Sequence, residues 1–306
     1  MAMTAKPRYL KLRYRRQVPS MTFPWQHRGG GLSLLKLTVF VALFLPGAWT
    51  LFGLAHGSLG PRPLNEAIHQ TGLWAVRFLM ISLAVSPLRR VLHWPRLVLV
   101  RRMIGVAAFA YALCHLCLYI WDQGFDIVMV SSEIVRRFYL TIGFTGLLLL
   151  AALAATSTDG MIRRLGGRSW RNLHRAVYGI GVLALVHYVL QSKLDVAEPF
   201  AVAGLFLWLM VYRAVGRLTR EGALPVWGLV LLGIAAGAAT ALGEAWYHAL
   251  AHGIDPRRVL AADLHWPFLG RPCWVVLLVS LGLAFLAALR RPRRQRAPAG
   301  LADATA

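Results

Sequence analysis

Acidic residues and cysteines are scarce in this sequence. Of its 306 residues, 12 are Asp or Glu, whereas 34 are Lys or Arg. Its three cysteines are too few for the disulfide framework that stabilises small secreted domains. Cys114 and Cys117 form a C-x-x-C pair, but Leu118 follows where covalent attachment of a c-type heme requires histidine. We therefore interpret the pair as two small apolar residues within a helix.

The sequence also lacks the features of a nucleotide-binding domain. None of the segments between the apolar runs is long enough to form a soluble domain of its own. No G-x-G-x-x-G follows a strand-like run, and the glycines at 29–31 lie in a basic tail. The sequence therefore excludes a Rossmann domain for a nicotinamide cofactor within this chain.

Long apolar runs dominate what is present. Apolar residues make up 58% of the chain and the mean hydropathy is +0.56, values typical of a helical membrane protein. A run of roughly 20 apolar residues suffices for a helix to cross a lipid bilayer. Eight runs qualify and predict an all-α membrane protein: 33–54, 72–88, 103–121, 139–156, 173–190, 197–214, 224–243 and 274–289.

The basic residues predict the orientation of these spans. They concentrate in the N-terminal tail, in alternate loops and in the tail from Arg290. The same segments hold only Asp159, Glu221 and Asp303 among the acidic residues. Because loops rich in Lys and Arg stay on the cytoplasmic side, we expect both termini in the cytoplasm. This alternation also argues against nucleic acid as the partner of the positive charge.

Histidines within the apolar runs are the strongest functional signal, because ionisable residues in a bilayer are costly. His115 in the third run and His187 in the fifth each lie about 12–15 residues from the inner end, and therefore at similar depth. Two neutral imidazoles at matched depth on facing helices suit the axial ligands of a low-spin heme b. The alternative is that each histidine hydrogen-bonds a neighbouring helix. Small residues in the same runs favour room for a macrocycle: Gly105, Ala107, Ala108, Ala110, Ala112, Gly179 and Gly181.

His174 is the candidate for a second heme nearer the inner face. It lies 13 residues before His187, about 20 Å along a straight helix, but the two side chains would point roughly 140° apart. The third run has Arg101 and Arg102 at that depth instead of a histidine. The sequence therefore leaves open one or two hemes, and the ligand opposite His174 stays unassigned.

Several motifs together resemble the MsrQ (YedZ) family, the heme-binding membrane subunit of a bacterial methionine sulfoxide reductase system within the ferric reductase-like transmembrane superfamily. The resemblance covers roughly residues 32–220 and is carried by short strings in series: Gly60-Pro-Arg-Pro63, His69-Gln-Thr-Gly72, Ser86-Pro-Leu-Arg89, Arg101-Arg-Met-Ile-Gly105, His115-Leu-Cys-Leu-Tyr119, Thr156-Ser157, Trp170-Arg-Asn-Leu-His174-Arg-Ala-Val-Tyr178 and His187-Tyr188.

The resemblance implies a six-helix heme-binding core with ligands at His115, His174 and His187. It further implies FMN, electrons from quinol, a periplasmic molybdopterin methionine sulfoxide reductase as partner, and a place in the bacterial inner membrane. His69 belongs to one of the shared strings, and we expect it near a quinone or flavin site.

The charge pattern predicts a basic cytoplasmic tail over 1–31, and the resemblance predicts the heme-binding core over 32–220, which leaves an extension over 221–306. The extension holds the last two spans, which a six-helix core does not need. Within it Glu244, His248 and His252 recur every four residues, on one helical face. A carboxylate and two imidazoles could hold a metal ion there. The alternative is a polar helix end facing water.

We therefore expect a membrane electron-transfer subunit rather than the catalytic subunit of a complex. One alternative is a heme-based ferric or oxygen reductase component that works with a separate flavin reductase. The other is a transporter with structural histidines. The spans show no obvious repeat and no acidic residue at mid-membrane, which disfavours the transporter.

Overall fold

The computed structural model describes residue 23 and residues 25–26, 31–192, 195–219, 224–265 and 268–290. Within these ranges the regular secondary structure is helical, apart from an isolated bridge between Gln26 and Leu32. The elements in chain order are α1 (Leu34–Ala55), α2 (Pro63–Val91), η1 (Pro95–Leu97), α3 (Val98–Asp122), α4 (Ile127–Arg136), α5 (Phe138–Ala155), α6 (Asp159–Leu165), α7 (Gly167–Leu173), α8 (Ala176–Gln191), α9 (Ala197–Leu218), α10 (Val226–His252), α11 (Pro256–Ala262), η2 (Phe268–Gly270) and α12 (Pro272–Leu289).

Eight helical segments in the described ranges are long and apolar enough to cross a bilayer, which confirms the predicted all-α membrane fold. Large apolar side chains face outward along them: Trp49 is 76% exposed and Leu45 is 61% exposed. Such a surface suits lipid as the surrounding solvent, because hydrocarbon chains are as apolar as these side chains. The chain is therefore a multi-pass membrane protein.

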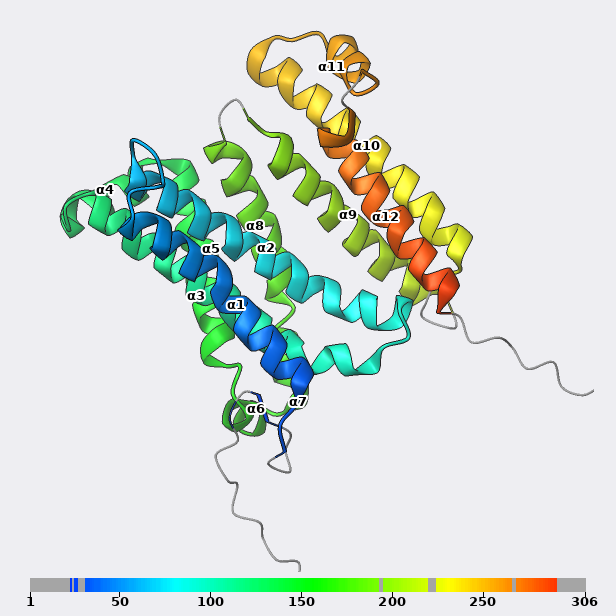
Figure 1. Cartoon of the computed structure of the whole chain (residues 1–306), viewed down its shortest axis with the longest axis horizontal. Helices are drawn as coiled ribbons and strands as arrows, with labels where there is room; N and C mark the ends of the chain where they lie inside the picture. Colours follow the sequence, from blue (N-terminus) through cyan, green and yellow to red (C-terminus); the bar gives the residue numbers. More distant parts are fainter. Residues whose placement is uncertain are drawn as a thin grey trace, which may run out of the picture.

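The helices form two groups that meet at α9 (Figure 1). α2 packs most extensively against α3, and α5 against α8, while α9 contacts both α2 and α8. α10 and α12 pack against each other and against α9. Their contact depends on small residues: a Cβ on Gly204 of α9 would lie 2.1 Å from Thr240 Oγ1, and one on Gly233 would lie 2.7 Å from Ser280 Cβ. Close approach of this kind is the usual basis of helix association in membranes.

α1 is held to α3 through an interruption in its own hydrogen bonding. Pro46 lies inside α1, and the hydroxyl of Tyr111 from α3 sits beside it. The Gly47 N–H donates to the Tyr111 hydroxyl at 2.7 Å, and this hydroxyl donates to the Leu43 carbonyl at 2.9 Å. A side chain inserted in this way satisfies backbone groups that a proline-containing helix leaves open.

Two predicted spans differ from the observed helices in ways that matter for the site. α2 begins at Pro63 rather than at 72, so His69, which precedes the predicted span, lies on the helix. The predicted run 173–190 is interrupted, because α7 ends at Leu173 and α8 begins at Ala176. His174 therefore caps the short helix α7 and does not share a straight helix with His187.

Candidate functional site

A cavity of about 450 Å³ lies between α2, α3, α5 and α8. Its walls come mainly from the first halves of α2 and α5 and from the second halves of α3 and α8, with Leu150 and Ile180 lying further into the bundle, so it lies toward one end of the bundle. A volume of this size falls within the usual range for cofactor sites, about 300–1,000 Å³. Its lining is mainly apolar but includes His69, His115 and His187. Under the orientation predicted from the basic residues, this end of the bundle faces outward.

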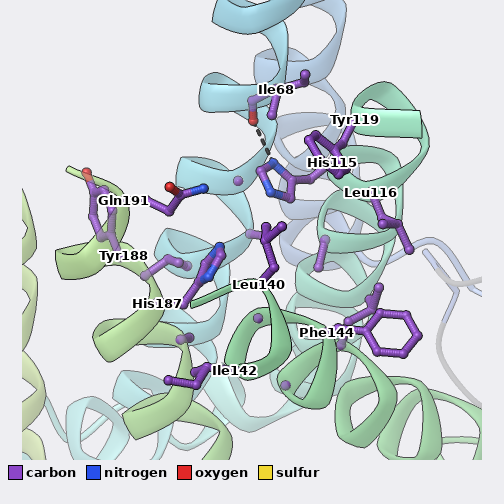
Figure 2. A pocket seen from close by; sticks show the side chains of 18 of the residues that line it. Ile68, His115, Leu116, Tyr119, Leu140, Ile142, Phe144, His187, Tyr188 and Gln191 are labelled. Atoms are coloured by element: carbon purple, nitrogen blue, oxygen red, sulfur yellow. Dashed lines mark hydrogen bonds between the residues drawn. The ribbon is translucent and has the colours of Figure 1, made fainter. Parts of the chain in front are cut away.

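His115 from α3 and His187 from α8 face each other across the cavity (Figure 2). Their ring centroids are 6.4 Å apart and their planes make an angle of 84°. A metal–imidazole bond is about 2.0–2.1 Å long. The nitrogen lies about 1.1 Å from the centre of a five-membered ring whose bonds are about 1.33 Å. Two imidazoles that share one metal ion should therefore have centroids about 6.3 Å apart, which matches the observed separation.

Hydrogen bonds to main-chain carbonyls determine which nitrogen of each ring is free. His115 Nδ1 lies 2.7 Å from the Ile68 oxygen of α2, and His187 Nδ1 lies 2.8 Å from the Tyr139 oxygen of α5. Because a carbonyl only accepts, each Nδ1 must carry the proton and donate. Each Nε2 then keeps its lone pair for a metal, and the ring orientation is fixed by the other nitrogen.

The small residues at the cavity differ from those that the sequence favoured. Of the seven predicted, only Ala112 lines it. Gly105 lies next to Ser82 of α2, and Gly181 lies against Phe206 of α9. The cavity instead has glycines from the two helices that carry no ligand candidate: Gly72 on α2, with Gly143 and Gly146 on α5. The prediction that these seven residues make room for the macrocycle was therefore wrong for all of them except Ala112.

His174 lies outside this cavity. Its ring stacks on Trp170 with centroids 4.0 Å apart, and its Nδ1 lies 3.1 Å from the Trp170 oxygen. Its Nε2 lies 3.3 Å from Ser157 Oγ. The helix break at His174 removes the basis for the predicted 140° offset from His187. Both nitrogens of His174 thus face polar groups of the protein itself.

His69 lines the cavity from α2, together with other polar side chains that gather at the end where α2 begins: Asn65, Tyr119, Tyr188 and Gln191. Tyr119 donates a hydrogen bond of 2.7 Å to Glu133 of the amphipathic helix α4. Glu133 also forms a 2.6 Å ion pair with Arg137. This polar rim was not predicted from the sequence, apart from His69.

The predicted metal site in the extension is not assembled. Within the described residues, no three His, Cys, Asp or Glu side chains are arranged to hold a metal ion. Residues four apart on an α-helix are rotated by about 40°, so Glu244 and His252 diverge by about 80°. Glu244 is buried, whereas His252 is exposed and its ring lies 5.4 Å from that of His248.

A buried carboxylate lies near Glu244 instead. Asp263 follows α11 and is only 4% exposed, and neither of its carboxylate oxygens has a hydrogen-bond partner among the described residues. Burial raises the pKa of the Asp263 carboxyl above its ordinary value. Nothing in the sequence marks this group, because Asp263 is brought close to Glu244 of α10 only when the chain folds.

Comparisons with known proteins agree with the architecture and with a heme. Residues 71–186 match the family described as ferric reductase like transmembrane component. The chain is 38% identical over 196 residues to the protein-methionine-sulfoxide reductase heme-binding subunit MsrQ of Azospira oryzae, covering 63% of this chain and 84% of that protein. It is 42% identical over 187 residues to the MsrQ of Rhodospirillum rubrum, covering 61% of this chain and 90% of that protein. No solved structure matches it. The chain belongs to the MsrQ family of heme-binding membrane subunits, with a ferric reductase-like transmembrane domain.

Proposed function

We propose that this protein is a membrane heme b subunit that passes electrons from quinol to a periplasmic molybdopterin methionine sulfoxide reductase. The axial ligands of its heme are His115 and His187. The observation that carries this proposal is the ring pair, with centroids 6.4 Å apart and each Nδ1 committed to a main-chain carbonyl. Hydrogen-bonded structural histidines have no need for two free Nε2 atoms across a shared cavity.

Heme bound in this cavity supplies one-electron chemistry within the membrane. The chain's own residues hold it and set its surroundings. The carbonyls of Ile68 and Tyr139 fix the two imidazoles. Apolar walls that include Leu79, Leu147 and Ile180 keep water away from the centre of the cavity.

The location of the cavity supports electron delivery to the outer side. The positive-inside pattern orients the protein in the bacterial inner membrane with both termini in the cytoplasm. The cavity then lies in the outer half of the bundle. In the described residues no soluble domain could complete a reaction with a protein substrate. The acceptor therefore docks from the periplasm, over the end of the cavity where His69 and Gln191 lie.

We assign His69 to contact with quinol or with FMN at this end, because it is an exposed imidazole on the cavity wall. FMN itself follows from the family resemblance. His174 remains a candidate ligand for a second heme toward the inner face. To serve as one, its Nε2 would have to leave Ser157.

Reoxidation kinetics test the proposed function. The full-length protein is reconstituted in liposomes, reduced with quinol, and mixed with the periplasmic reductase and methionine sulfoxide. We expect reoxidation of the heme to be much faster with both than with either alone. Ferric chelate and oxygen, each without the partner, test the alternative reductase function. Reoxidation that is no faster with the partner and sulfoxide than without them would contradict the proposed acceptor.

A further inference from the structure

Each imidazole of the ring pair lies directly over a glycine of the neighbouring helix. A Cβ on Gly72 of α2 would lie 2.9 Å from His115 Nδ1, and one on Gly143 of α5 would lie 2.7 Å from His187 Nδ1. Both distances are shorter than real side chains tolerate. Any other residue at either position would have to displace the imidazole that lies over it.

Each glycine also lies four residues after the residue whose carbonyl accepts the hydrogen bond from the ring. His115 donates to Ile68, four residues before Gly72, and His187 donates to Tyr139, four residues before Gly143. In an α-helix the carbonyl of residue i lies beneath residue i+4. Without a Cβ at i+4, the ring can lie against the backbone and reach the carbonyl's second lone pair. α2 and α5 thus present the same arrangement to two different ligand helices.

We propose that Gly72 and Gly143 are positioning residues, which we call glycine seats, for the two axial histidines. Each seat sets the orientation of its imidazole and keeps the Nδ1–H in contact with a helix carbonyl. This proposal rests on the proposed function, because it takes His115 and His187 as the ligands of the heme iron. It explains why the glycines at the cavity lie on α2 and α5 rather than on α3 and α8.

The seats have a measurable electronic consequence. Donation from Nδ1–H to a carbonyl makes an imidazole a stronger electron donor and favours ferric iron. An added methyl at Gly72 or Gly143 must push the ring from 2.9 Å or 2.7 Å to ordinary contact at 3.4 Å or beyond, which disrupts hydrogen bonds of 2.7 and 2.8 Å. Because the hydrogen bond is present in both oxidation states, the midpoint potential shifts by the difference between its strengths in the ferric and ferrous forms, and each tenfold change in the ferric-to-ferrous ratio is about 59 mV for one electron.

The first test compares Gly72→Ala and Gly143→Ala with Gly179→Ala in the full-length protein. Gly179 lies in α8, and a Cβ there meets nothing within 4 Å, so this control carries the same gain in helix propensity. We expect both seat variants, but not the control, to raise the midpoint potential and alter the low-spin EPR signal, or to lose heme while the protein stays inserted. Seat variants indistinguishable from the control in all three readouts would overturn the proposal.

A double-mutant cycle separates positioning from general packing. The three heavy atoms nearest to a Cβ on Gly72 all belong to His115. Gly72→Ala should therefore lower the thermal stability of the heme-free protein when His115 is present, and cost nothing further in the His115→Ala background. An equal loss of thermal stability in both backgrounds would show a packing role and refute the proposal. This cycle needs no heme, whereas wild-type membranes without a b-type spectrum would refute the proposed function itself.

Discussion

Removal of either imidazole should convert the heme from a six-coordinate to a five-coordinate state. Half of the 6.4 Å ring separation is 3.2 Å. Subtracting about 1.1 Å from ring centre to nitrogen leaves about 2.1 Å, a usual metal–imidazole distance, so the two imidazoles would hold one iron between them. His115→Ala or His187→Ala would remove one of these two ligands and leave the other in place. We expect the low-spin population to fall from nearly all of the heme in this cavity to nearly none.

The angle between the rings adds a second observable for the unmodified protein. The two planes are 84° apart, close to perpendicular. Perpendicular axial imidazoles raise two iron d orbitals almost equally, whereas parallel ones raise one of them. The ferric protein should therefore show a strongly axial low-spin EPR signal with one large g value. X-ray absorption on the same sample measures the bond length.

The control for both measurements is His174→Ala, because His174 lies outside the cavity and faces Ser157 and Trp170. It should leave the signal of this heme unchanged, whatever it does to a second one. A rhombic signal typical of parallel planes would refute the ring geometry. Low-spin spectra and full heme content in both ligand variants would refute the assignment of His115 and His187.

Three further predictions concern the whole chain. Truncation after Glu221 should leave heme binding intact, because none of the described residues of α10 or α12 lines the cavity; loss of heme on truncation would contradict this. A reporter fused after Arg290 should be active in the cytoplasm and one near Asp263 in the periplasm, and the reverse would overturn the topology. Asp263 is buried beside Glu244, Arg271 and Cys273, and its pKa, raised by burial, means that the folded state binds its proton more tightly than the unfolded state. Stability should therefore fall as the pH rises from the ordinary pKa toward the raised one, and Asp263→Asn should remove this contribution and raise the stability at neutral pH; an unchanged pH dependence of thermal unfolding would count against it.

The sequence predicted the number of spans because a bilayer imposes a simple length and polarity requirement on each helix. It misplaced the start of α2 by nine residues, 72 instead of Pro63. The first turns of this helix carry Asn65, Glu66 and Gln70, which a hydropathy criterion rejects although they are helical. Glu66 and Gln70 form a 2.7 Å hydrogen bond one turn apart. Pro63, which suits the first position of a helix, was the available signal.

The break at His174 was not predicted, because the apolar pattern continues across it. Short helices before it depend on local features that hydropathy ignores. Thr158 caps α6 by accepting a hydrogen bond from the Met161 N–H at 3.2 Å, and Gly166 separates α6 from α7 with a φ of 75°. Threonine before an acidic residue and paired glycines are recognisable in the sequence. Their consequence for His174, which becomes a helix cap, requires the three-dimensional chain path.

The histidine pair and its glycine seats differ in how visible they are to sequence reasoning. A histidine in a membrane span is rare and costly, so His115 and His187 stand out without any knowledge of the fold. Glycine is common here, with 28 in the chain; no local pattern marks Gly143, and Gly72 appears only as the last residue of the string His69-Gln-Thr-Gly72, with nothing to link it to His115. An imidazole extends away from its own helix, so the backbone that it crowds belongs to a neighbour. A glycine on the ligand helix itself can contact another partner, as Gly181 contacts Phe206. The residue that makes room for a ligand histidine therefore lies on the adjacent helix. It is a glycine one turn after a residue whose carbonyl the ring can reach.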